Sequence, residues 1–235
     1  MSGVRLSLVV PCFNEADNLP ALVQRCVALT EAVNAEVILV ENGSTDRSAD
    51  VIGGLVAPHE RVRAVLLREN AGYGGGILAG LAAARGAIVG WTHADLQTDP
   101  MDAARGLALF EQAPNSFVKG QREGRPLKDA VFTWGMTAFE LAVLGVGMWD
   151  INAQPTLFHR DLYESWQDPP SDFSLDLYAF HSAVKARLSI RRFPVTFGDR
   201  EAGEGNHDTL AGRLRTVRKT VEYSLKLRRR LAEER

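Results

Sequence analysis

The segment from Trp91 to Pro100, W-T-H-A-D-L-Q-T-D-P, carries the side chains most suited to chemistry in this 235-residue chain. It follows an apolar run, Ala87 to Gly90, that predicts a buried strand. In an extended segment the side chains of His93, Asp95 and Gln97 would point to one side. An imidazole, a carboxylate and an amide oxygen gathered at a strand end can hold a divalent cation against a phosphate.

A simpler interpretation makes this segment a polar strand end with a helix cap. Asp99 stands directly before Pro100, and proline at the first helical position after a capping aspartate is a common helix start. Such a cap accounts for Asp99 but leaves His93, Asp95 and Gln97 unexplained. On this segment alone both interpretations stay open.

Length and composition predict one soluble α/β domain. A hydrophobic content of 46% and a charged content of 24% are ordinary for a globular protein, and the net charge of −2 argues against nucleic acid as a partner. Cys12 and Cys26 lack metal-ligand spacing, which favours a reduced compartment. We find neither a signal-peptide pattern nor a run of about 20 apolar residues. A cytoplasmic protein that meets membranes only at their surface is therefore expected.

Apolar runs alternate with helical patterns, which predicts a mostly parallel sheet with helices on both faces. The expected strands are Leu6 to Val10, Glu36 to Val40, Val62 to Leu67, Ala87 to Trp91, Asn115 to Lys119, Thr156 to Phe158 and Leu188 to Val195. The expected helices are Leu19 to Val33, Ser44 towards Leu55, Gly76 to Ala84, a stretch after Pro100, Leu127 to Leu144 and Leu175 to Ala186.

Ligands of such sheets bind beyond the carboxyl ends of the strands. Four polar or glycine-rich segments follow strands there: Pro11 to Glu15, Glu41 to Asp46, Asn70 to Gly76 and Thr92 to Asp99. The glycines of the third segment would let backbone N–H groups approach a phosphate, or would simply allow a tight turn and close helix packing.

Single residues in these segments also carry two interpretations. Glu15 contacts a ribose or base, or is a first-turn acid favoured by the helix dipole. Glu41, Asn42 and Asp46 could read the polar edge of a base, and Asp46 also suits a helix cap.

A basic cluster follows the fifth expected strand, at Lys119, Arg122, Arg125 and Lys128. It is either a solvated loop or a contact for phosphate. Arg200 lies in a glycine-bearing loop and either closes over a ligand or pairs with its acidic neighbours.

Four of these motifs together resemble the family 2 glycosyltransferases, especially the branch similar to dolichyl-phosphate mannose synthase. The motifs are V-V-P-C-F-N-E at Val9 to Glu15, V-E-N-G-S-T-D at Val40 to Asp46, N-A-G-Y-G-G-G-I at Asn70 to Ile77 and H-A-D-L-Q at His93 to Gln97. They come in the family's order and spacing and cover the chain as far as Arg125. A weaker match runs from Phe193 to Arg200.

The resemblance implies a GT-A fold, a nucleotide-diphosphate sugar as donor, inversion at the anomeric carbon and a divalent metal. It assigns metal binding to Asp95 with Gln97 and His93 beside it, and catalytic roles to Asp95, Arg122 and Asp176. The residues expected to contact the nucleotide sugar are Pro11, Phe13, Glu15, Glu41, Asn42, Asp46, Asn70, Gly74, Ala94, Asp95, Lys128 and Arg200.

The chain departs from the family pattern at four places. His93 stands where the family has the first Asp of D-A-D, and imidazole suits Mn²⁺ better than Mg²⁺. Asn42 replaces a common acid. Gly203-Glu204-Gly205-Asn206 replaces a lysine-bearing pattern, and Asn152 to Thr156 replaces the usual S/C-G-F on the acceptor side.

The expected acceptor is a polyprenyl phosphate, whose oxygen is anionic near neutral pH and needs no general base. A sugar hydroxyl would need one, and the resemblance makes Asp176 the candidate. One alternative is therefore a sugar-to-sugar transferase that builds surface polysaccharide. Another is a non-catalytic nucleotide-sugar-binding protein, suggested by His93 and the missing lysine.

We expect a catalytic domain over residues 1–209 and a basic amphipathic helix over residues 210–235. The helix places apolar residues such as Leu214, Val221 and Leu225 among several arginines and lysines. Such a helix fits an anionic membrane surface. It could equally pack on its own domain or on the second subunit of a homodimer.

Overall fold

A seven-stranded sheet organises the chain in the computed structural model, which describes residues 3–123, 127–198 and 210–233. Within these ranges only the backbone is described for residues 127–134, 210–216 and 231–233. The strand order is β3-β2-β1-β4-β6-β5-β7. The strands are β1 (Leu6–Cys12), β2 (Ala35–Asn42), β3 (Val62–Leu67), β4 (Ile88–Trp91), β5 (Ser116–Glu123), β6 (Thr156–His159) and β7 (Ser189–Thr196).

The sheet is mostly parallel, as predicted. β1 pairs in parallel with β2 and β4, β2 with β3, and β5 with β7, while the short β6 runs antiparallel to both β4 and β5. The parallel strands therefore all end at one edge of the sheet. All eight residues of β2 are buried, and the middle of the strand, Val37 to Val40, is entirely apolar, as expected for a strand covered on both faces.

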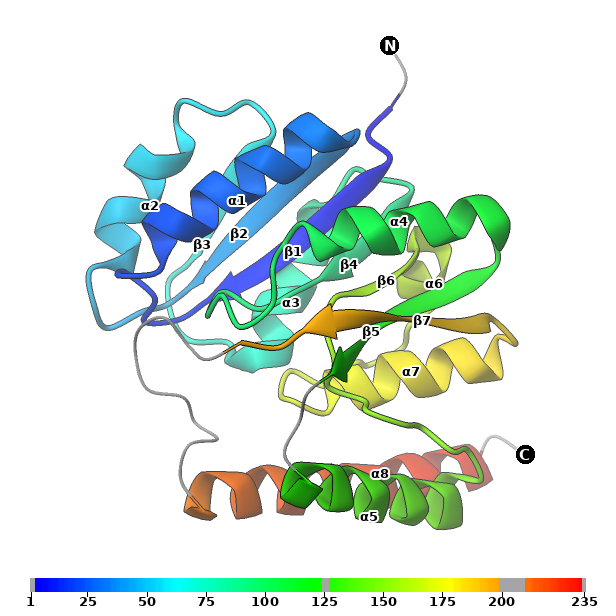
Figure 1. Ribbon diagram of the computed structural model, residues 1–235. Coiled ribbons are helices and arrows are strands. Elements are labelled where there is room, and N and C mark those ends of the chain that lie inside the picture. The colour runs from blue at the N-terminus through cyan, green and yellow to red at the C-terminus, as the bar shows by residue number, and fades with distance from the viewer. Residues whose placement is uncertain (1–2, 124–126, 199–209, 234–235) are drawn as a thin grey trace.

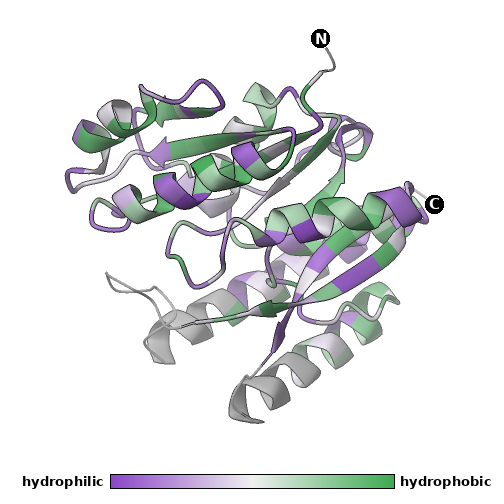
Figure 2. Cartoon of the chain, turned by 45° about the horizontal axis from the view of Figure 1, so that its top comes forward, coloured by the Kyte–Doolittle hydropathy of each residue, from purple (hydrophilic) through white to green (hydrophobic). Residues whose placement is uncertain are grey.

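Helices cover both faces of the sheet (Figure 1). One apolar core lies under α1 (Leu19–Ala32), α2 (Ser48–Val56) and α4 (Asp102–Gln112), and a second lies under α3 (Gly72–Ala83), α6 (Arg160–Glu164) and α7 (Leu175–Lys185). Figure 2 shows the corresponding contrast in hydropathy. Much of the sheet is hydrophobic, and hydrophilic residues lie mainly on the outer sides of helices and in loops.

The helix α3 begins at Gly72, four residues before the predicted start at Gly76. Gly72 has φ +81°, a conformation that side-chain-bearing residues rarely adopt. A Cβ atom on Gly80 would lie 2.3 Å from Val9 Cγ1, and one on Gly74 would lie 2.6 Å from the Pro170 carbonyl oxygen. The glycines thus let α3 pack closely on the sheet and on the segment before α7, as the packing interpretation proposed.

Two other predicted helix starts are wrong. Asp99 Oδ1 accepts the Met101 N–H at 2.8 Å, as the predicted cap would, but the chain first makes a turn with i to i+3 backbone hydrogen bonds, so α4 begins at Asp102 rather than at Pro100. The helix expected from Ser44 begins at Ser48, after a loop whose residues bind the β1 end.

The helices α5 (Leu127–Leu144) and α8 (Leu210–Glu233) lie side by side beyond α7 (Figure 1). Glu140 and Ser224 meet between them, with Ser224 Oγ 2.9 Å from Glu140 Oε1, and burial raises the pKa of Glu140 to about 7. The C-terminal helix therefore packs on its own chain. In the described parts of the chain, we find no helix with the length and apolar character needed to cross a membrane.

The close approach of α3 to the sheet makes a direct stability test. Gly80→Ala forces a methyl group against Val9 and Val40, and we expect a loss of about 1–3 kcal/mol in the free energy of unfolding, measured by urea denaturation. The control is Gly54→Ala in α2, where no atom lies within 4 Å of the added Cβ, and we expect a gain of up to about 1 kcal/mol. Equal effects of the two changes would contradict this packing.

Candidate active site

The carboxyl ends of β1, β2, β3 and β4 bring the four predicted segments to one edge of the sheet. The segments after β1 and β2 interlock. Asn14, with φ +57°, accepts the N–H groups of Thr45 and Asp46 at 2.8 and 3.3 Å through its side-chain oxygen. Asp46 Oδ2 in turn accepts the Ala16 N–H at 3.1 Å. Although partial burial opposes it, hydrogen bonding from Ser48 and Ala16 lowers the pKa of Asp46, so this carboxylate stays charged.

Glu41 and Asn42 are buried, and the protein itself uses their polar atoms. Glu41 Oε1 accepts the Ser44 N–H at 2.7 Å. Asn42 Nδ2 donates to the Gly72 carbonyl at 2.9 Å, and its Oδ1 accepts the Ala71 N–H at 3.1 Å. These contacts fix the loop after β2 and the start of α3, so they explain both residues without a ligand.

Other expected contact residues lie nearer to solvent at this end of the site. Phe13 is 39% exposed, and Pro11 is half-buried beside Gly76 of α3. Glu15 is also half-buried, and its Oε2 accepts from Asn18 Nδ2 at 2.5 Å. Asn70 is exposed, and its side-chain oxygen accepts the Gly72 N–H at 2.7 Å. An aromatic ring and two polar side chains therefore remain at the surface beside the interlocked loops.

The segment after β4 is bent, so the predicted alternation of His93, Asp95 and Gln97 along an extended chain is wrong. Leu96 has φ +59°, and Asp95 Oδ1 accepts the Gln97 N–H at 3.2 Å across the bend. Asp95 is 7% exposed, its neighbour Ala94 is buried, and His93 is half-buried.

The end of β7 is tied to this bend. The Gly198 N–H donates to the Gln97 carbonyl at 2.9 Å, and Gln97 Nε2 donates to the Gly198 carbonyl at 3.2 Å. The guanidinium of Arg122 lies 5.4 Å from the centre of the Phe197 ring. The end of β5 and the segments after β4 and β7 therefore lie together around Arg122 and Gln97.

The donor set at the bend suits a metal that shares its ligands with a diphosphate. Among residues 3–123, 127–198 and 210–233, no three His, Cys, Asp or Glu side chains gather into a metal site. Asp95 offers a carboxylate, His93 an imidazole and Gln97 an amide oxygen, a set too weak for an all-protein cage. These residues fit a cation whose other ligands are phosphate oxygens.

Arg122 and Asp150 form an ion pair at the β5 end of the site. Arg122 Nε lies 3.1 Å from Asp150 Oδ1, and a second guanidinium nitrogen contacts the same oxygen. The side chain of Arg122 is 16% exposed, so its remaining donors lie near the surface beside Phe197. Asp150 thus holds in place the arginine that the sequence assigned to phosphate binding.

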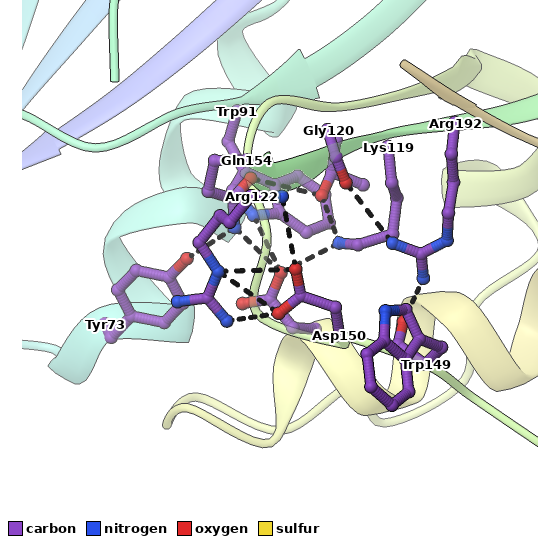
Figure 3. A network of polar contacts seen from close by, with 11 residues as sticks. Tyr73, Trp91, Lys119, Gly120, Arg122, Trp149, Asp150, Gln154 and Arg192 are labelled. Carbon is purple, nitrogen blue, oxygen red and sulfur yellow. Dashed lines mark hydrogen bonds and ion pairs between the residues drawn. The ribbon is translucent and has the colours of Figure 1, made fainter. Parts of the chain in front are cut away.

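Asp176 belongs to a buried polar network with Trp91, Lys119 and Gln154, which are labelled in Figure 3. Its Oδ1 atom accepts from Gln154 Nε2 at 2.9 Å and from Trp91 Nε1 at 3.3 Å, and it lies 3.5 Å from Lys119 Nζ. Gln154 Nε2 also lies 3.2 Å from the hydroxyl of Tyr73. Burial, together with Asp176 and Asp95, raises the pKa of Tyr73, so its hydroxyl keeps its proton.

Sequence reasoning placed Asp95, Arg122 and Asp176 in one site. In the structure Asp95 follows β4, Arg122 lies near the end of β5, and Asp176 at the start of α7 contacts Trp91 at the end of β4. Sequence reasoning missed Tyr73, Trp91, Asp150, Gln154 and Arg192. Trp91 ends β4, Tyr73 lies in the glycine-rich motif, and Gln154 lies in the unusual Asn152 to Thr156 segment, so these three had a sequence signal. Asp150 and Arg192 had none; Arg192 lies in the middle of β7 and donates to the Gly120 carbonyl at 3.2 Å. Arg200 and the side chain of Lys128 lie outside the described residues.

Curated proteins with related sequences are polyprenyl-phosphate sugar transferases by name. An undecaprenyl-phosphate 4-deoxy-4-formamido-L-arabinose transferase of Pseudomonas fluorescens is 34% identical over 169 residues, covering 68% of this chain and 48% of that protein. The protein of the same name from Sodalis glossinidius is 39% identical over 111 residues, covering 46% of this chain and 34% of that protein. The chain thus spans between about a third and a half of the length of these relatives.

Solved structures with a similar fold include glucosyl-3-phosphoglycerate synthase from Mycobacterium tuberculosis. Its complex with phosphoglyceric acid has a TM-score of 0.73 and 19% identity, covering 97% of this chain and 80% of that chain. Its complex with Mn²⁺, uridine diphosphate and glucosyl-3-phosphoglycerate has a TM-score of 0.71 and 20% identity. At such identities the likeness shows the fold alone, which is the predicted GT-A fold. Residues 7–178 match the sequence family described as Glycosyl transferase family 2, and the chain belongs to that family.

Proposed function

We propose that this chain transfers a sugar, with inversion, from a nucleotide-diphosphate sugar to a polyprenyl phosphate. The names of the related transferases support this acceptor class. The observation that carries the proposal is the state of Asp176, the family's candidate base. This carboxylate is 1% exposed and already accepts from Trp91 and Gln154. A polyprenyl phosphate suits such a site because its anionic oxygen attacks without a general base.

The donor would bind across the two ends of the site. Phe13 offers an exposed ring for the base, and Glu15 and the Asn14–Asp46 contact lie next to it. The diphosphate would lie towards Asp95 and Arg122. A divalent cation held there neutralises charge on the leaving diphosphate. Asp95 would bind that cation, and the imidazole of His93 favours Mn²⁺ over Mg²⁺.

Arg122 supplies the protein's own positive charge at this end. Its guanidinium is fixed by Asp150 and lies against Phe197, so it is oriented before any ligand arrives. An oriented cation stabilises developing phosphate charge without reorganising during the reaction. This arrangement suits contact with the donor diphosphate or with the phosphate of the acceptor.

Removal of the Asp95 carboxylate tests the donor site. We expect Asp95→Asn to lower sugar transfer by about 10²-fold or more, because one charged metal ligand is lost. Transfer is measured as labelled sugar that becomes extractable into organic solvent, with Mn²⁺ and undecaprenyl phosphate present and a panel of nucleotide sugars as donors.

Asp99→Asn is the matched control, since Asp99 is exposed and an asparagine oxygen can still accept the Met101 N–H. Near-normal transfer by Asp95→Asn would refute the metal assignment. A wild-type protein that binds a nucleotide with Mn²⁺ but neither hydrolyses the donor nor transfers sugar would favour the non-catalytic binder. Label that appears only in a water-soluble glycan would favour the sugar-to-sugar transferase.

A lipid acceptor requires contact with a membrane surface, and we propose that α8 makes it. Its exposed residues include Arg218, Lys219, Lys226, Arg228 and Arg229. Leu225 of α8 is 43% exposed, and Leu141 of the adjoining α5 is 54% exposed. Cationic side chains around exposed apolar ones fit an anionic bilayer surface on the cytoplasmic side. The same face would suit the interface of a homodimer. The liposome experiment below distinguishes membrane binding from dimer formation.

Neutralisation of three cations tests this contact. We expect the triple variant Lys226→Gln, Arg228→Gln and Arg229→Gln to bind liposomes containing phosphatidylserine about 10²-fold more weakly in sedimentation assays, at about 1 kcal/mol per charge. Neutral phosphatidylcholine liposomes should bind wild type and variant equally weakly. Binding that is unchanged by the substitutions would exclude α8 as the contact, and a concentration-dependent mass of twice the chain would instead indicate a dimer.

A further inference from the structure

Lys119 is a charged side chain in the interior of the protein. It lies in the middle of β5 between buried neighbours, and it is 0% exposed. Removing an ammonium group from water costs several kcal/mol unless it is paired and hydrogen-bonded. Its Nζ atom donates to Thr156 Oγ1 at 2.6 Å and lies 3.5 Å from Asp176 Oδ1. The fold thus retains a costly ion pair next to the site.

Three chain segments meet at Oδ1 of Asp176, the carboxylate that pairs with Lys119. Trp91 reaches Asp176 Oδ1 from the end of β4, Gln154 reaches it from the segment before β6, and Lys119 reaches it from β5. Thr156 Oγ1 closes the group, since it lies 3.1 Å from Gln154 Oε1. All three donors would lose this shared acceptor if the carboxylate moved.

From Gln154 the network continues to the metal-binding bend. Gln154 Nε2 meets the Tyr73 hydroxyl, and the Tyr73 ring stacks on Phe173 at 4.5 Å and on His93 at 6.0 Å between ring centres. His93 is two residues before Asp95. An unbroken series of contacts therefore joins the interior ion pair to the segment that would hold the donor diphosphate.

We propose that Lys119 is a positioning residue for the transfer reaction, acting with Asp176 to hold Gln154, Tyr73 and the His93–Asp95 bend in their reactive arrangement. This inference rests on the proposed function. It gives Asp176 the role of an anchor for three donors rather than that of a base. It also explains why a charged lysine is present at position 119, where an apolar side chain would avoid the free energy of desolvation.

The charge on Lys119 makes the network sensitive to pH. Burial lowers the pKa of Lys119 from its ordinary 10.5 to about 8, and Arg192 acts in the same direction while Asp176 and Asp150 oppose it. Above about pH 8 the amine becomes neutral, and the network loses the cation beside Asp176. Transfer should therefore fall as pH rises through 8.

Folding stability changes in the opposite sense. A lysine whose pKa is lower in the folded than in the unfolded protein adds to the free energy of unfolding as pH rises from about 8 to 10.5. A purely structural role would thus produce no loss of folding from this group over the range in which transfer declines. The two readouts separate positioning from stability.

The test compares wild type, Lys119→Met, Asp176→Asn and the double variant in the full chain. We expect Lys119→Met to lower kcat about tenfold or more with a smaller change in donor KM, and to remove the decline above pH 8. Lys185→Met, an exposed lysine at the end of α7, is the control and should match wild type. If Lys119→Met does not fold, the double variant removes both charges and takes its place.

A second readout needs no substrate. The indole N–H resonance of Trp91, assigned with Trp91→Phe, reports its hydrogen bond to Asp176, and in wild type it should shift with a midpoint near pH 8. Lys119→Met and the double variant, which both lack the titrating amine, should abolish that shift. Lys119→Met, but not Lys185→Met, should also shift the amide resonances of His93 to Asp95.

The outcomes distinguish this inference from the proposed function. A wild-type Trp91 resonance that stays constant from pH 7 to 9.5, or active Lys119→Met protein with unchanged kcat and unchanged amide shifts at His93 to Asp95, would overturn the positioning role. A Trp91 resonance that titrates as expected in a protein without any transfer activity would support the ion pair and refute the transferase proposal.

Discussion

The packing of α3 against β1 and β2 is the constraint on which the rest of the site depends. Gly80 allows the helix to lie within van der Waals distance of Val9 and Val40, and Gly76 brings it against Asn42. Asn42 then binds the first turn of the helix through both ends of its amide. Because Tyr73 belongs to that turn, its position is set by contacts made in the core of the sheet.

This arrangement joins two chemically different ends of one site. At the β1 and β2 end, side chains bind backbone groups of neighbouring loops, which leaves Phe13 exposed beside a rigid frame. At the β5 end, charges are paired with one another, as in Arg122 with Asp150 and Lys119 with Asp176. Tyr73 lies between the β1 and β2 end and the β5 end of the site. In the proposed function, one nucleotide sugar contacts both ends.

The apolar pattern was sufficient to predict the sheet and most helices. Strand β3 and helix α5 have the predicted bounds, and the mostly parallel sheet follows from the near-continuous apolar strands. The predictions failed where local backbone chemistry decides. The positive φ of Leu96 breaks the alternation after β4, and Asp99 turns the chain three residues before α4 begins. The sequence pattern carries no direct signal for such turns.

The buried polar contacts could not be read from the sequence for a different reason. Lys119 and Asp176 are 57 positions apart and belong to a strand and a helix that meet only in the folded chain. The predicted strand ended at Lys119, whereas β5 continues to Glu123. A lysine at the end of a strand is usually solvated, so the sequence favoured a surface position for Lys119. Gln154 lies in the Asn152 to Thr156 segment that departs from the family pattern, and Asp150 lies two residues before it. That departure indicated the region but not the residues with which these side chains pair.

The proposed function requires that one edge of the sheet binds a metal-bound diphosphate between Asp95 and Arg122. Paramagnetic broadening by Mn²⁺ in the presence of a nucleoside diphosphate measures this most directly, because it depends steeply on distance from the metal. If the diphosphate lies there, amide resonances of residues 93–97 and 122 broaden first, and only when nucleotide is present. The resonances of α8 stay sharp. Broadening centred elsewhere, or unaffected by nucleotide, would contradict this position of the diphosphate.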